Sequence, residues 1–295
     1  MANTIPAYAV AYTKLFRSLY EFSALTSVFD RQAELLRSGS TAVSMLNITA
    51  VGLGTYSKTN GYPIGKITAE WLPYILACDR GREFSIDRID DMGMMGGTAR
   101  EAARVFVENH VTPEIDAYRF AKYYTGAGTK ATPATLTSST ALDAIKVGLR
   151  VLDSNRVPRR NRYIFVSDEV LGFVEDSVSR LYVNDEGINS EVTSINRIPV
   201  IMVPQSEFYS AITLDAGATE TAGGYAKTSP ASDINFLIVQ QDAVAQAVLI
   251  DKLKIFDPDV NQEMDSFKIQ HRIYHDAFVN TAFNKAIYGH AKVAA

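Results

Sequence analysis

The sequence predicts an α+β fold, and three observations lead to that prediction. Apolar residues recur at spacings of three and four through residues 97–125, which is typical of a helix with one buried face. Alternating and β-branched runs surround the turn-forming pair Asn60-Gly61 within residues 43–91. Short strand-like and helix-like units then alternate through residues 140–250, as in a layered α/β unit. A chain of 295 residues, 47% of them hydrophobic, can bury the core of one or two domains.

Composition narrows the function classes. The formal charge is −4 and the isoelectric point is near 5.6, so no basic field favours the reading of nucleic acid, although a container whose inner wall tolerates DNA stays open. The single cysteine, Cys78, excludes an intramolecular disulfide and a multi-cysteine metal site, and we expect it to be a buried apolar filler. The first twenty residues lack a signal-peptide pattern, and no run of 18 apolar residues predicts a membrane span. We therefore expect synthesis in the cytoplasm.

The first segment, residues 8–37, places Leu15 and Phe22 among apolar residues spaced mostly by three or four. This spacing indicates a helix. It fits either an amphipathic helix at a domain edge or an arm that lies on a neighbouring subunit, and composition does not separate the two.

A long two-stranded ribbon is predicted on either side of Asn60-Gly61, followed by a further extended segment at 82–92. Such a ribbon is marginal in water by itself and presents unpaired edges. It also carries apolar side chains that need a cover, namely Ile64, Ile67, Trp71, Leu72 and Ile75. Either the chain's own core or a neighbouring subunit would provide that cover, and the sequence leaves both open.

The helix expected over residues 97–125 contains Pro113, which lacks a backbone donor. Thr112 before it has the character of an N-cap, so we expect a kink or a restart there. Residues 126–138 are small and polar and suggest a linker. Beyond them the pattern predicts helices at 141–152 and 169–177, strands at 163–166, 199–203 and 236–239, a long half-exposed strand at 265–279 and a short closing segment at 285–293.

Candidate chemistry is sparse. Gly96 and Gly97 precede a helix but lack the spacing of a phosphate-binding loop. The stretch from Ser167 to Glu169 follows a strand and opens a helix, which predicts an N-cap rather than a nucleophile.

His271 and His275 are four residues apart in a predicted strand, where about 13 Å of chain separates them, so a shared metal is not expected. The acidic residues Asp87, Asp90 and Asp91 suggest a solvated turn. No base, nucleophile and oxyanion site come together. We therefore predict no catalytic residue, metal or cofactor.

The order of parts resembles a known family. ALDAIKVGLRVLDSNRVPRRNRYIFVSDEVLGFVEDS, NFLIVQQDAVAQAVLIDKLKIFDPD, FKIQHRIYHDAFV and KAIYGH look like stretches of tailed-bacteriophage major capsid proteins of the Hong Kong 97-type fold. The likeness covers nearly the whole chain, and its patterns are loose rather than invariant.

The resemblance implies five segments. These are an N-terminal arm (1–42), an extended loop with a peripheral-domain strand (43–91), a spine helix with the peripheral domain (92–139), an axial domain (140–250) and closing peripheral-domain strands (251–295).

The resemblance also implies a non-enzymatic shell protein. It would assemble with itself as pentamers and hexamers into an icosahedral virion capsid around double-stranded DNA, with a portal and decoration proteins as further partners. The assembly contacts would include Ile64, Ile67, Trp71, Leu72, Leu15 and Phe22. The start at Met1, close to the arm, suggests a separate scaffolding protein and no maturation cleavage. Lys58 and Lys66 with Asn280 or Asn284 match the residue types of the family's isopeptide cross-links, but no catalytic carboxylate is evident, so we expect no cross-link.

Two other interpretations stay open. An encapsulin-type compartment would keep the fold and enclose a cargo protein in place of DNA, which co-purification would reveal. A soluble α+β enzyme would instead fold the ribbon around Trp71 into its own core and form a small oligomer, which electron microscopy would reveal.

Overall fold

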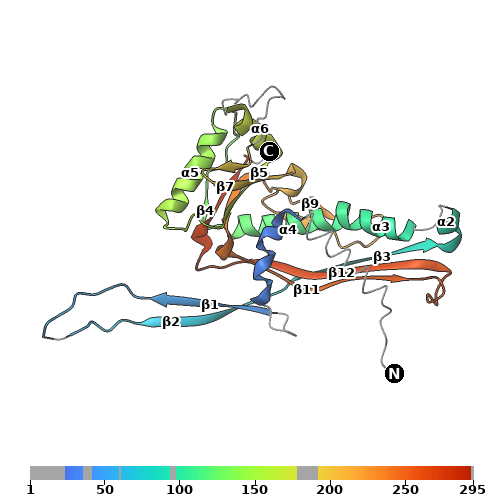
Figure 1. Ribbon diagram of the computed structural model, residues 1–295, viewed down its shortest axis with the longest axis horizontal. Helices are drawn as coiled ribbons and strands as arrows, with labels where there is room; N and C mark the ends of the chain where they lie inside the picture. The colour runs from blue at the N-terminus through green and yellow to red at the C-terminus, as the bar shows by residue number, and fades with distance from the viewer. Residues whose placement is uncertain (1–23, 36–41, 60, 94–97, 178–191, 294–295) are drawn as a thin grey trace.

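The computed structural model describes residues 24–35, 42–59, 61–93, 98–177 and 192–293. The chain is elongated, with three parts arranged along and above its long axis (Figure 1). A two-stranded hairpin projects at one end, a long three-stranded sheet with helices lying along it extends to the other, and a six-stranded sheet with two helices stands above the junction. The α+β prediction is confirmed.

The hairpin consists of β1 (Ala42–Ala50) and β2 (Ile67–Ile75), paired antiparallel from Ala42↔Ile75 to Ala50↔Ile67. Gly61 has a φ of 76°, a conformation that glycine adopts without steric cost, and it bridges to Ser57. The predicted two-stranded ribbon is therefore confirmed.

The extended segment predicted at 82–92 is wrong in its second half. Strand β3 (Cys78–Asp87) ends where helix α2 (Arg88–Gly93) begins. The Asp87 side chain accepts a hydrogen bond from the Ile89 backbone at 2.8 Å, which satisfies a free donor of the first helical turn. Asp90 and Asp91 thus belong to a helix, and Asp91 is buried, so the expected solvated turn is also wrong.

Strands β11 (Val244–Phe256), β12 (Ser266–Val279) and β3 form the long sheet in the order β11-β12-β3. Along it lie α3 (Thr98–Phe106), the π-helical segment η2 (Val107–Val111) and α4 (Thr112–Gly126) (Figure 1). The core between them is made of Ala24, Ala103, Val107, Val111, Ile115, Leu253, Ile269 and Ile273. This helical run agrees with the predicted helix at 97–125.

Pro113 is accommodated by a change of helical pitch. The backbone stays helical at Val111 and Thr112, and Thr112 donates its amide to the carbonyl of Val107, five residues back. A π-turn of this kind lets the helix continue past the proline, which has no backbone N–H to donate. The N-cap expected at Thr112 is therefore wrong.

The six-stranded sheet has the order β4-β13-β10-β5-β7-β6. Its centre is β10 (Ile234–Gln240), buried along its whole length, between β5 (Arg162–Ser167) and β13 (Ile287–Ala291). The outer strands are β7 (Ile198–Val203), β6 (Ser194–Ile195) and β4 (Thr129–Lys130). Helices α5 (Ala141–Ser154) and α6 (Asp168–Ser177) pack on it, as predicted.

The linker expected at 126–138 is in fact bound to this sheet. Strand β4 pairs parallel with β13, and Gly128, Ala131 and Ala134 donate backbone hydrogen bonds to residues 284, 289 and 291. The boundary expected at residue 250, between the axial domain and the closing strands, does not coincide with a boundary between the two sheets. Strand β11 crosses that position, and β13 joins the six-stranded sheet rather than the long one.

The remaining elements are short. Strands β8 (Ile212–Leu214) and β9 (Tyr225–Lys227) form a small hairpin, and η3 (Gln205–Glu207), η4 (Gln241–Ala243) and η5 (Asn284–Ala286) are single 3₁₀ turns. The helix predicted within 8–37 is present over η1 (Leu25–Leu35), a 3₁₀ helix, whereas Leu15 and Phe22 lie outside the described residues.

Candidate assembly interface

The β1–β2 hairpin has one apolar face. Side chains alternate along a strand, so Ile67, Trp71 and Ile75 of β2 share a face. Residues directly opposite in an antiparallel pair also share a face, and Ile48 of β1 is opposite Ala69, so it joins them. Ile48, Ile67, Trp71 and Ile75 are 60%, 71%, 63% and 69% exposed. The four therefore form an uncovered apolar stripe, the hairpin stripe.

The opposite face of the hairpin serves two purposes. Next to the loop that joins β1 and β2 this face is polar, with Thr68 and Glu70 exposed to solvent. Near the base, Tyr74 packs on Phe278 of β12 with ring centroids 5.3 Å apart, in a cluster that includes the buried Leu76. The hairpin is thus fixed to the body through one face, and the stripe faces away from that attachment.

The loop beyond the paired strands, residues 51–66, is also apolar and open. Its exposed large side chains are Val51, Leu53, Tyr56, Tyr62 and Ile64, and Ile64 is fully exposed. Leu72, by contrast, is half-buried on the attached side. The interpretation that the chain's own core covers Ile64, Ile67 and Trp71 is therefore wrong, and cover by a neighbouring subunit stays a prediction.

The candidate polar sites have structural explanations. The Ser167 hydroxyl accepts a hydrogen bond from the Val170 amide at 3.4 Å, so the predicted N-cap of α6 is confirmed. Cys78 is buried, and burial raises the pKa of its thiol to about 12, which confirms the expected filler. Gly96 and Gly97 lie outside the described residues.

The two histidines of β12 are buried separately. His271 lies 3.5 Å from a carboxylate oxygen of Asp251, and His275 packs edge-on against Tyr118. Burial lowers the pKa of His275 to about 3, so this side chain is neutral at ordinary pH. Within the described ranges, no three His, Cys, Asp or Glu side chains are grouped to hold a metal ion. In the same part of the chain, no helix is long and apolar enough to cross a membrane.

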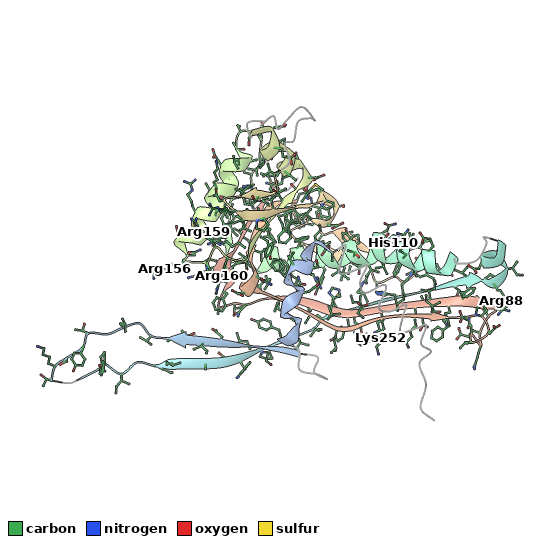
Figure 2. All side chains as sticks on the ribbon, in the orientation of Figure 1. Arg88, His110, Arg156, Arg159, Arg160 and Lys252 are labelled. Carbon is green, nitrogen blue, oxygen red and sulfur yellow. The ribbon has the colours of Figure 1, made fainter. Side chains whose placement is uncertain are left out.

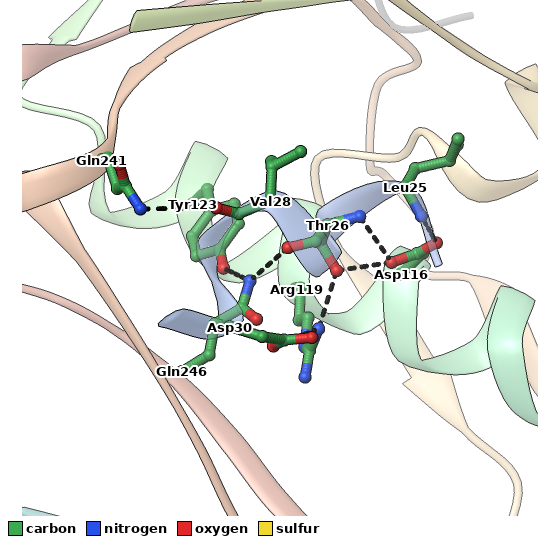
Figure 3. Close-up of polar contacts among 9 residues, drawn as sticks. All are labelled: Leu25, Thr26, Val28, Asp30, Asp116, Arg119, Tyr123, Gln241 and Gln246. Carbon is green, nitrogen blue, oxygen red and sulfur yellow. Dashed lines mark hydrogen bonds and ion pairs between the residues drawn. The ribbon is translucent and has the colours of Figure 1, made fainter. Parts of the chain in front are cut away.

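Sequence reasoning missed a buried polar cluster that anchors η1 (Figure 3). Asp116 of α4 accepts hydrogen bonds from the backbone amides of Leu25 and Thr26 at 2.7 and 3.2 Å, and from the Thr26 hydroxyl at 2.5 Å. Arg119 donates to the same hydroxyl at 2.8 Å, and Gln246 of β11 donates to the Thr26 carbonyl. Burial raises the pKa of Asp116, while these hydrogen bonds and Arg119 oppose the shift. The only local sequence signal was the spacing of Asp116 and Arg119, three residues apart in α4.

A second missed feature joins the long sheet to the loop between β8 and β9. Arg80 of β3 pairs with Glu114 of α4 at 2.6 Å and donates to the carbonyls of residues 215 and 224. Arg82 donates to the carbonyls of residues 219, 220 and 222. A groove of about 720 Å³ lies behind this loop, and it includes His271 and His275. Within it, Arg80 and Arg82 connect β3 to α4 and to the loop between β8 and β9.

Comparison with known proteins gives a structural answer only. No protein-family model matches the chain, and no curated protein sequence matches it. Solved structures do. A capsid structure of the cyanophage P-SCSP1u has a TM-score of 0.65 at 13% identity, covering 88% of this chain and 85% of its own. The mature capsid of bacteriophage PhiM1 has a TM-score of 0.62 at 10% identity, covering 86% and 82%.

A third structure, a virus-like particle from Pyrococcus furiosus, has a TM-score of 0.53 at 8% identity and covers 96% of this chain and 99% of its own. Identities this low establish the fold alone. In each of the three comparisons more than four fifths of both chains are covered, so the shared fold extends over most of this chain. The chain therefore has the fold of tailed-bacteriophage major capsid proteins.

Proposed function

We propose that the chain is a structural shell subunit, the major capsid protein of a tailed bacteriophage, with no catalysis of its own. The hairpin stripe carries this proposal. A stable monomer does not gain by holding Ile48, Ile67, Trp71 and Ile75 in water on a projecting ribbon, whereas a subunit that lays the ribbon on a neighbour removes them from water.

The energy of such a contact is sufficient. Burial of a large aliphatic side chain contributes about 1.5–3 kcal/mol, and the stripe offers three of them beside a tryptophan. Even after ordering costs, several kcal/mol per contact remain, and a closed shell repeats the contact for every copy. The ribbon and the surface it meets are different patches, so the contact is heterologous and closes rings by rotation.

In finer terms, we propose pentamers and hexamers that form an icosahedral virion capsid around double-stranded DNA. The sequence-independent enclosure of DNA agrees with the acidic isoelectric point of the chain, near 5.6. A separate scaffolding protein, a portal and decoration proteins are further proposed partners. Within this proposal, the Hong Kong 97-type segments take the roles that the resemblance implies.

The decisive experiment is to express the chain alone and with its neighbouring structural genes, and to examine it by sedimentation velocity and electron microscopy. Rings or round shells support the proposal. A stable monomer whose tryptophan fluorescence shows Trp71 buried would refute it, because the stripe would then be covered within one chain.

One alternative keeps the shell and changes the contents, and the virus-like particle among the structural neighbours favours keeping it. In that case the shell is a protein compartment of the encapsulin type. Mass spectrometry and nuclease treatment of purified particles separate the two, since a phage head contains DNA and a portal and a compartment contains a loaded protein.

A further inference from the structure

Residues 209–233, here called the strap, leave the six-stranded sheet, reach the long sheet with the loop between β8 and β9, and return. We propose that the strap opens and closes on its own while the rest of the fold stays intact, and that Arg80 and Arg82 hold it closed. The inference goes beyond the proposed function, because it concerns a movement within one chain.

The strap begins and ends at one place on the core. Phe208 and Ile234, the residues on either side of it, are fully buried. The Ile234 amide donates to the Phe208 carbonyl at 2.9 Å, and the Ser210 amide donates to the Ser232 carbonyl at 2.9 Å. The two ends are thus fixed together, so the segment between them can move without displacing the core strands.

The strap has little apolar anchorage. None of its residues, all of which lie in the described part of the chain, is buried. Most of them are small, and its larger apolar side chains, such as Ile212, Leu214 and Tyr225, are only half-buried. Burial of apolar surface supplies most of the stability of a fold, so a segment without it belongs to the part that opens most easily.

Two arginines of β3 hold the strap against the long sheet. Arg80 donates to the carbonyls of residues 215 and 224 at 2.6 and 3.3 Å. Arg82 donates to the carbonyls of residues 219 and 222 at 3.3 and 2.9 Å, and also to that of residue 220. Closer to the base, the Tyr225 hydroxyl donates to the Ser206 carbonyl at 3.0 Å.

Arg82 is the more specific of the two holding residues. Arg80 also pairs with Glu114 of α4, whereas every hydrogen bond of the Arg82 guanidinium within the described residues goes to the strap. A hydrogen bond from a charged donor changes an equilibrium by about tenfold to a hundredfold. The carbonyls can bond to water when the strap opens, so these bonds favour the closed state without making it permanent.

A glycine lets the strap fit onto Arg82. Gly217 has a φ of 67°, which a residue with a side chain rarely adopts. A Cβ at this position would lie 3.0 Å from Nη1 of Arg82. The closed state therefore depends on two separate features, the guanidinium and the glycine, and each can be changed without the other.

The closed strap forms one wall of the groove of about 720 Å³. Strap residues 215–217 and 220–224 line it, and the helical rod lines it with His110 among other residues. His110 is labelled in Figure 2, and β9 is labelled beside the rod in Figure 1. Opening of the strap would remove this wall and release the guanidiniums of Arg80 and Arg82.

Trypsin provides a direct test on the full-length chain. Lys227 is the single lysine or arginine in residues 198–251, and it lies in β9, where it is opposite Ile212 and pairs with Asp233 at 2.6 Å. A protease needs unpaired, extended chain, so cleavage after Lys227 reports how often the strap is open. A free hairpin with such short strands is marginal in water, so a released strap should be cut.

Arg82→Ala should speed cleavage after Lys227 by at least tenfold and leave the midpoint of thermal unfolding within a few degrees of wild type. Arg82→Lys should fall between the two, because one ammonium does not replace a guanidinium that reaches three carbonyls. Gly217→Ala should also speed cleavage, although Arg82 is intact. The control is Arg160→Ala, an exposed arginine of the loop after α5, labelled in Figure 2, and it should match wild type.

Hydrogen exchange measured by mass spectrometry gives the second readout, in the wild-type protein. Peptides that cover β8 and β9 should exchange at least a hundredfold faster than those of the buried β10, and Arg82→Ala should widen this difference.

Equal exchange of β8, β9 and β10 in wild type would overturn the inference, because the strap would then open only with the whole fold. The same holds if Arg82→Ala behaves like Arg160→Ala, or if it speeds exchange in β10 as much as in the strap. Any of these failures would leave the proposed function untouched, since that proposal depends on the hairpin stripe.

Discussion

Trp71→Asp is the substitution that separates folding from assembly most sharply. Trp71 is 63% exposed in the single chain, on the face of the hairpin that points away from its attachment. The free subunit therefore loses little when the indole is removed. A contact that covers the hairpin stripe loses the indole and gains a carboxylate without a partner.

The magnitude follows from exposed area. An aromatic side chain buries about 150–250 Å² when fully covered, and roughly 100–160 Å² of that remains available at Trp71. At about 25 cal/mol per Å², the contact loses about 2.5–4 kcal/mol, and burial of an unpaired charge adds to the loss. Since each 1.4 kcal/mol is about tenfold in an equilibrium constant, assembly should weaken by at least a hundredfold per contact.

The assay compares assembly with folding in the same preparations. Light scattering against subunit concentration gives the first, and the midpoint of thermal unfolding of the unassembled subunit gives the second. Thr68→Asp is the matched control, because Thr68 is exposed on the polar face of the same strand, three residues away. It introduces the same residue with a similar strand-propensity cost of up to about 1 kcal/mol.

We expect Trp71→Asp to leave the unfolding midpoint within a few degrees of wild type and to abolish shells at concentrations where Thr68→Asp still forms them. Shells of Trp71→Asp at the wild-type concentration would remove the hairpin stripe from the interface. Equal impairment by both variants would show that the strand itself, and not its apolar face, was disturbed.

Three further predictions concern the folded subunit. Burial raises the pKa of Glu207 from 4.5 to about 7. Between those two values the folded state binds more protons than the unfolded state, so the stability of the fold falls as pH rises. In thermal unfolding, Glu207→Gln should therefore stabilise the subunit at pH 8 and have little effect at pH 5. Cys78 should resist alkylation in the native state and react once unfolded, as mass spectrometry would show, because burial raises the pKa of its thiol to about 12. In denaturant titrations, Gly128→Ala should destabilise the fold by about 2 kcal/mol or more, because its Cβ would lie 2.7 Å from the Asn284 backbone. Gly52→Ala is the control and should be neutral, because the space around Gly52 is open.

Sequence patterns predicted the elements that depend on local periodicity. The two-stranded hairpin, the helical rod at 98–126 and the strands β5, β7 and β10 were all indicated by spacing and turn residues. The stretch from Arg88 to Gly93 was assigned incorrectly because the side chain of Asp87, rather than the apolar spacing, starts α2. The pitch change before Pro113 was expected only as a kink or restart, since a π-turn has no sequence signature of its own.

Features that depend on distant partners were missed. Strand β4 exists because β13, about 160 positions later, offers its edge, and nothing in residues 126–138 indicates such a partner. The cluster around Asp116 joins Thr26 and Gln246, which are 90 and 130 positions away from it. Pairings of this kind are set by the fold as a whole, so a single sequence does not contain a local signal for them.

For the hairpin stripe, the sequence predicts that an apolar face exists but not which surface covers that face. The alternation of Ile67, Trp71 and Ile75 indicates one apolar face. Which face the body covers depends on where the base is attached, and Tyr74 places that attachment on the opposite face. A ribbon attached by one face presents the other to solvent. In the described part of the chain the stripe stays largely exposed, and the proposed function assigns its cover to a second copy of the same subunit.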